Sequence, residues 1–199
     1  MTPTLWLKPV TLQGTHATLV PLSPSFEQAL AEASSDGELW KLWFTHVPSP
    51  AEMADEIDRR LARQALGEML PFAVLDHTGR AVGMTTFLNP DPVHRRVEIG
   101  ATWYAQGVQR TPLNTECKLL LMTHAFEALD CIAVEFRTSA LNRRSRYAIE
   151  RLGARLDGIL RSHQRHRNGT LRDTCVYSVI ASEWPTVQAH LRFELSRTP

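Results

Sequence analysis

The sequence contains few cysteines and no motif built from them. Cys117, Cys131 and Cys175 are odd in number, and none of them forms a Cys-x-x-Cys pair. This pattern excludes the common structural zinc sites and a framework of disulfide bonds. We therefore expect reduced thiols, no bound metal ion and a location in the cytoplasm.

Long apolar segments are also absent. No run approaches the roughly 18 consecutive apolar residues that span a membrane, and residues 1–9 lack the basic and apolar regions of a secretory signal. Low-complexity segments and internal repeats are missing as well. With 43% hydrophobic and 22% charged residues, we expect the 199 residues to form one globular domain, spanning residues 1–199, without membrane contact.

The net charge is only +1, but the charges are distributed unevenly. From Glu27 to Asp58, eight acidic residues stand against one lysine, whereas from Arg137 to Arg172 ten arginines stand against two acids. This asymmetry favours an anionic ligand for the C-terminal half, although a solvated arginine face is the alternative. Nucleic acid is disfavoured as a partner, because no aromatic residues alternate with the arginines and no recognised motif is present.

The periodicity of apolar residues predicts an alternation of strands and helices. Strands are expected at 70–75, 81–88, 95–104, 132–138, 155–166 and 171–180, with a hairpin or bent strand at 10–22. Helices are expected at 23–34, 50–66, 114–129, 142–152 and from 182 onward. Antiparallel hairpins at both ends and one β-α-β crossover in the middle indicate an α/β (α+β) sheet of mixed polarity.

The segment from Val97 to Leu129 combines a strand, a polar loop and a helix. Such a helix start leaves backbone N–H groups unpaired and carries partial positive charge, which favours phosphate binding. Arg110 in the loop can add a bidentate phosphate contact. The alternative is an ordinary junction that binds nothing.

Several short motifs follow one another in a fixed order. They are Glu98-Ile99-Gly100 with Trp103-Tyr104, the run Asn114 to Glu127, Asn142-Arg143-Arg144-Ser145, the run Ile149 to Ala154, Gly158 to Arg161, Gly169 to Thr174, and Ser182-Glu183-Trp184-Pro185. In this order and spacing they resemble the GNAT acyltransferases over nearly the whole chain. Within that superfamily the chain is most similar to the RimJ/RimL-type branch, the protein N-terminal acetyltransferases.

The resemblance implies a GNAT-like mixed, mostly antiparallel sheet of about seven strands, flanked by helices and splayed between Ile99–Tyr104 and Ile132–Thr138. It implies acetyl-CoA as the co-substrate and transfer of the acetyl group to a primary amine, on a protein N-terminus or a small molecule, by direct attack on the thioester. A homodimer through the C-terminal strands is a further expectation. By position, the acetyl-CoA-binding residues would be Ile99, Ala101, Trp103, Gln109, Arg110, Thr111, Leu113, Asn114, Thr115, Asn142 and Ser145.

Three positions depart from the family pattern. Arg110 and Pro112 stand where the phosphate loop usually carries glycines, and Ile149 stands where many relatives have a tyrosine as general acid. We expect the Arg110 guanidinium to replace lost backbone hydrogen bonds. The alternative is a CoA-binding regulatory module with little or no transferase activity.

Glu98 is the candidate general base, because burial of a carboxylate in an apolar strand raises its pKa towards neutrality. The structural alternative is an ion pair with Arg95, Arg96 or an arginine of another strand. By resemblance, Ser145 lies near the thioester sulfur and helps to protonate the leaving thiolate, while Asn142 also serves as a helix cap. The aromatic residues before the Pro48 break either form the acceptor site together with Glu98 or pack in the core, and they are Trp40, Trp43 and Phe44.

Overall fold

The structure, a computed structural model, describes residues 5–197, so part of the N-terminal segment considered for a signal lies outside it. Its strands form one sheet in the order β1-β2-β3-β4-β5-β6-β8-β7. The strands are β1 (Leu12–Gln13), β2 (Ala17–Pro21), β3 (Met69–Asp76), β4 (Ala81–Asp91), β5 (Arg96–Tyr104), β6 (Ala133–Ser139), β7 (Arg155–Arg165) and β8 (Leu171–Ile180). The helices are α1 (Glu27–Ser35), α2 (Met53–Ala65), α3 (Pro112–Thr123), α4 (Arg143–Glu150) and α5 (Trp184–Ser196), with a π-helical turn η5 (His124–Ala128) and short 3-10 turns η1 (Pro24–Phe26), η2 (Leu39–Lys41), η3 (Pro50–Glu52) and η4 (Gln106–Val108).

The predicted fold class is confirmed. All neighbouring strands pair antiparallel except β5 and β6, which are parallel and joined by the α3 crossover. The sheet has eight strands rather than about seven, because the predicted hairpin at 10–22 divides into β1 and β2. No helix among residues 5–197 is long and apolar enough to cross a membrane.

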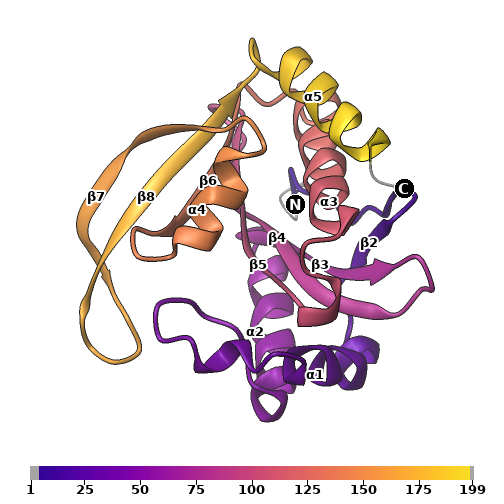
Figure 1. Ribbon diagram of the computed structural model, residues 1–199, viewed down its shortest axis with the longest axis vertical. Helices are drawn as coiled ribbons and strands as arrows, with labels where there is room; N and C mark the ends of the chain where they lie inside the picture. Colours follow the sequence, from indigo (N-terminus) through magenta and orange to yellow (C-terminus); the bar gives the residue numbers. More distant parts are fainter. Residues whose placement is uncertain (1–4, 198–199) are drawn as a thin grey trace.

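The sheet opens where β5 meets β6. The two strands pair only through Arg96–Glu98 on β5 and Ala133–Glu135 on β6. Beyond these residues β5 runs on to Tyr104 beside β4, while β6 runs on to Ser139 beside β8. The predicted splay is therefore present, and Figure 1 shows the long β7–β8 hairpin leading away from the N-terminal half of the sheet.

Two apolar clusters hold the helices on the sheet. The larger one joins α3, α5 and one face of the sheet, and its fully buried members include Phe72, Phe87, Leu121 and Tyr177. The smaller one joins α1 and α2 to the opposite face of β3, β4 and β5. The N-terminal half of the sheet is thus covered on both faces, whereas nearly all of β7 is exposed.

Helix α3 begins at Pro112, so the start predicted at Asn114 is wrong by two residues. Thr111 caps the helix, its Oγ1 accepting from Leu113 N at 3.4 Å. Proline at the first helical position needs no hydrogen-bond donor and already has a helical φ, which explains the earlier start. The loss of a donor at Pro112 therefore costs the helix nothing.

Glu116 on α3 fastens the β1–β2 turn. Its buried carboxylate accepts hydrogen bonds from Thr15 N, His16 N and Ala17 N at 2.9, 2.5 and 2.7 Å. A Cβ at Gly14 would overlap this carboxylate, which explains a glycine in the turn. Part of the Asn114–Lys118 motif thus has a structural role.

Candidate active site

We call β5, the loop 105–111 and α3 the donor side of the opening, because most residues expected to bind acetyl-CoA lie there. Strand β5 bulges there: between the pairs Thr86–Gly100 and Met84–Trp103 it carries one residue more than β4. Ala101 in the bulge has a φ of +47° and is exposed. Exposed backbone on the open edge of a strand can pair with an extended ligand.

The three predicted β5 positions differ in their surroundings. Ile99 and Ala101 lie just past the last residue that pairs with β6, beside the opening. Trp103 pairs with Met84 of β4, and its side chain is buried in the smaller apolar cluster. The backbone of all three residues lies past the last β5–β6 pair, but the Trp103 side chain points away from the opening into the core.

The loop before α3 is held by its own hydrogen bonds. Gln109 Nε2 donates to Tyr104 O at 3.0 Å, and Thr111 Oγ1 donates to Val108 O at 2.7 Å. Leu113 and Thr115 are buried, and Thr115 Oγ1 accepts from Arg151 at 3.0 Å. At a helix start of this kind, the N–H groups of Thr111 and Asn114 have no intrahelical acceptor, so they are the donors left for an anion.

The backbone of Arg110 has a conformation that favours glycine. Its φ is +64°, a left-handed conformation that glycine adopts without strain and that L side chains adopt only at a cost. The side chain is exposed and makes no hydrogen bond or ion pair within residues 5–197. The guanidinium is therefore free to contact a phosphate.

Asn142 caps α4, its Oδ1 accepting from Ser145 N at 3.1 Å. The Ser145 side chain is partly exposed in the first turn of this helix. Ile149 is buried and Tyr147 is exposed on another face of α4, so the helix places no tyrosine at the usual general-acid position.

Glu98 lies at the last β5–β6 pair, where the opening begins. Its Oε2 accepts from Asn89 Nδ2 at 2.8 Å, and Arg137 Nε lies 3.5 Å from the same oxygen. Arg96 instead pairs with Glu135, and Arg95 donates to Leu129 O. The predicted ion pair with an arginine of another strand is therefore present, and that arginine is on β6.

Burial raises the pKa of Glu98, and the positive charges of Arg137 and, more weakly, Arg172 act against this effect. Glu98 is 7% exposed, and its contacts with Asn89 and Arg137 are both made by Oε2, so within residues 5–197 its Oε1 accepts no hydrogen bond. A carboxylate of this kind, with a raised pKa and one free oxygen, suits the transfer of a proton near neutral pH.

We call the segment 37–50 and the β7–β8 hairpin the acceptor side, because the residues expected to contact the acceptor, Trp40, Trp43 and Phe44, lie in this segment. The Trp43 ring meets the His166 ring edge-on with centroids 5.0 Å apart, and Arg167 Nη2 lies 3.8 Å from Glu52 Oε1. Trp40, Trp43 and Phe44 belong to neither apolar cluster, and Trp43 is 45% exposed. Core packing, the alternative for these three, is therefore not what the structure has.

Asp36 connects the two sides. At the end of α1, its Oδ2 accepts from Gly107 N at 2.7 Å and its carbonyl accepts from Gln106 N at 3.3 Å. The segment that leads to the acceptor side is thus tied to the loop that follows β5.

Two buried cations contact the bulge from opposite faces of the sheet. The sequence pattern does not predict a role for either. Lys118 on α3 donates to Thr102 Oγ1 at 2.8 Å, and burial lowers its pKa to about 8. Arg60 on α2 donates to Thr86 Oγ1 at 2.6 Å and lies 3.5 Å from Ala101 O, with Glu56 as its ion-pair partner. In the sequence, each is a charged residue on the otherwise apolar face of a predicted helix, and this position indicates a buried charge.

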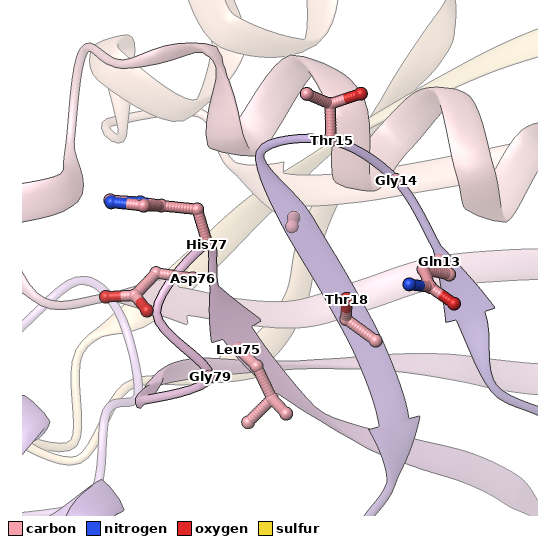
Figure 2. A pocket seen from close by; sticks show the side chains of 9 residues that line it. Gln13, Gly14, Thr15, Thr18, Leu75, Asp76, His77 and Gly79 are labelled. Carbon is pink, nitrogen blue, oxygen red and sulfur yellow. The ribbon is translucent and has the colours of Figure 1, made fainter.

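A separate cavity of about 350 Å³ lies between the β1–β2 and β3–β4 turns. Figure 2 shows its lining, which includes Thr15, Asp76 and His77. The Asp76 carboxylate already accepts from Thr78 and Arg80 within its own turn. Its polar lining is therefore turn structure, and we assign no ligand to it.

A splayed sheet, a bulged strand at the opening and a helix start beside it define a GNAT acyltransferase fold. The family model described as an acetyltransferase (GNAT) domain matches residues 16–155. The chain therefore belongs to the GNAT acetyltransferase family and is an acetyltransferase.

The most informative relative is a Bacillus subtilis (strain 168) protein named "Putative ribosomal N-acetyltransferase YdaF". It is 31% identical over 173 residues, which cover 85% of this chain and 93% of the relative. This match agrees with the expected RimJ/RimL-type branch.

Solved structures share the fold. A GCN5-related N-acetyltransferase from Brucella melitensis is 28% identical with a TM-score of 0.85, covering 99% of this chain and 90% of its own. Mycobacterium smegmatis RimJ, solved in complex with CoA-disulfide, has a TM-score of 0.80 at 21% identity, with 95% and 96% of the two chains covered. The latter likeness concerns the fold alone.

Proposed function

We propose that the protein is an acetyl-CoA-dependent N-acetyltransferase that acts on a primary amine, with a protein N-terminus as the favoured acceptor. The observation that carries this proposal is the position of Glu98, a buried carboxyl with a raised pKa at the point where β5 and β6 separate. The name of the Bacillus subtilis relative supports a ribosomal protein as the acceptor and therefore a reaction in the cytoplasm.

The residues of the donor side fit acetyl-CoA as the co-substrate. The open edge of β5 at Ile99 and Ala101 suits the extended pantetheine arm, and the free guanidinium of Arg110 with the first N–H groups of α3 suits the pyrophosphate. Acetyl-CoA supplies the activated acyl group. The backbone N–H groups of the bulge would polarise the thioester carbonyl.

Glu98 would accept the proton that the amine must lose before or during attack. Because Ile149 is buried and no tyrosine takes its place, Ser145 is our candidate for hydrogen bonding to the departing thiolate. A homodimer through β7 and β8 stays a prediction from the family resemblance.

Release of free thiol from acetyl-CoA, measured over a panel of N-terminal peptides and small amines, tests the proposal. We expect thiol release with at least one class of amine and thermal stabilisation by acetyl-CoA. Tight CoA binding with no release on any amine would contradict it and favour the regulatory module. An absence of thermal stabilisation by acetyl-CoA would contradict both.

A further inference from the structure

Arg172 is a half-buried arginine that forms no ion pair with any residue from 5 to 197. Its Nε is inaccessible to solvent and has no hydrogen-bond acceptor, and none of the acidic residues within 5–197 lies within ion-pair distance of its guanidinium. Burial accordingly lowers its pKa. Burying a guanidinium without a hydrogen-bond acceptor is costly. A ligand that accepts from Arg172 would therefore offset this cost.

The register places Arg172 on the same sheet face as Glu98. On β8, Val176 pairs with Arg137 and Thr174 pairs with Ser139, and side chains two residues apart share a face. Arg137 in turn shares the face of Glu135, which pairs with Glu98. Arg172 lies past the last β6–β8 pair and pairs with Gln164 near the tip of the β7–β8 hairpin, whose turn residue His166 contacts Trp43.

The other buried or half-buried arginines of this face each have a carboxylate. Arg96 and Arg137 pair with Glu135, and Arg60 pairs with Glu56 at 2.7 Å. Arg137 also lies 3.5 Å from Glu98. The two carboxylates of the group at the opening therefore form ion pairs with Arg96 and Arg137, whereas Arg172 feels the charge of Glu98 only from beyond ion-pair distance.

We propose that Arg172 binds a carboxylate carried by the acceptor, close to the amine that Glu98 serves, so that the acceptor is an amine with a neighbouring acid group. This inference rests on the proposed acetyl transfer and specifies its substrate class. Two sources have this chemistry: a peptide whose first residue has an acidic side chain, and a free amino acid with its α-carboxylate. A guanidinium binds either one through charge-assisted, often bidentate hydrogen bonds.

Matched acceptor pairs test the proposal. One pair consists of C-terminally amidated peptides that differ only in an aspartate or an asparagine at the first position, and the other of alanine and alaninamide. We expect the wild-type kcat/KM to be roughly tenfold higher for the carboxylate member of one pair, the size expected for a hydrogen bond to a charged group. The pair that shows the preference identifies the source.

Arg172→Gln should reduce this preference to about onefold. The preference is a ratio of two acceptors within one variant, so it is independent of any change that the lost charge causes at Glu98. Arg161→Gln is the matched control, since Arg161 is an exposed arginine of the same hairpin, and it should keep the wild-type preference. Equal use of both members of each pair by the wild type, or a preference retained in Arg172→Gln, would overturn the inference.

Calorimetric titration of the same four compounds in the presence of CoA separates the two proposals. If amines are acetylated without any carboxylate preference, the acetyl transfer stands and the role of Arg172 is wrong. If nothing is acetylated, the transfer is wrong, and the role of Arg172 is decided by whether a carboxylate-dependent affinity exists in the wild type and disappears in Arg172→Gln.

Discussion

The donor side and the acceptor side of the opening satisfy their charges in opposite ways. On the donor side the buried groups Glu116, Lys118 and Arg60 all have hydrogen-bond partners inside the protein. On the acceptor side Arg172 forms no ion pair with residues 5–197 and Trp43 is half exposed. The buried donor-side atoms that lack a hydrogen-bond partner within these residues, Trp103 Nε1 and Tyr104 Oη, belong to uncharged side chains. We interpret the donor side as built in advance for one constant co-substrate, and the acceptor side as completed by its ligand.

The largest expected effect concerns stability on the donor side. Glu116→Gln would place an amide N–H against three backbone donors, and we expect a loss of about 3 kcal/mol in the free energy of unfolding, measured by urea denaturation. Glu127→Gln, which alters a carboxylate that contacts only Trp184 and Gln188, should cost about 1 kcal/mol. Equal losses in the two variants would mean that the hydrogen bonds of Glu116 to the β1–β2 turn contribute no more than an ordinary contact.

Glu98→Gln should lower kcat/KM about 100-fold near neutral pH with unchanged affinity for CoA. The carboxylate form is the base, and burial raises its pKa, so the wild-type rate should fall as the pH decreases through a value above that of an ordinary glutamate. The variant should lack this acid limb. A full-rate variant, or one with the same pH profile, would assign Glu98 to the ion pair with Arg137 alone.

Lys118→Met should separate stability from activity. It removes a buried ammonium, so the variant should be about 1 kcal/mol more stable at pH 7, but the loss of the contact with Thr102 should lower kcat about tenfold. The lysine pKa is lower in the folded state, at about 8, than in the unfolded chain. Wild-type stability should therefore rise relative to the variant as the pH increases above 8. If the difference in unfolding free energy between wild type and variant does not change with pH, titration of the buried lysine does not contribute to it.

Arg110→Gly tests the exposed part of the donor side. Glycine relieves the positive φ, so we expect the free energy of unfolding to rise by about 0.5 kcal/mol. Loss of the guanidinium should weaken CoA binding about fivefold, and raising the salt concentration should reduce that difference. Unchanged CoA affinity would contradict the phosphate contact.

The sequence predicts the fold well because the apolar periodicity of each element agrees with its place in the sheet. The α3 crossover follows from local patterns, whereas the splay is implied by the family resemblance. The roles of Lys118, Arg60 and Arg172 do not, because the partners of Lys118 and Arg60 lie on other elements and Arg172 is notable only for lacking one. The start of α3 differs from the prediction because Pro112, whose φ already suits a helix, occupies the first helical position.

Trp43→Ala should have the smallest effect and is the most direct test of the acceptor side. The ring is 45% exposed and meets His166, so its loss should raise the KM for the amine about threefold and change the free energy of unfolding by less than about 1 kcal/mol. Leu42→Ala, in the neighbouring exposed position, is the control and should leave the KM for the amine unchanged. Affinity for CoA should be unaffected in both variants, because neither residue lies on the donor side. If Trp43→Ala weakened CoA binding and left the KM for the amine unchanged, the segment 37–50 would belong to the donor side instead.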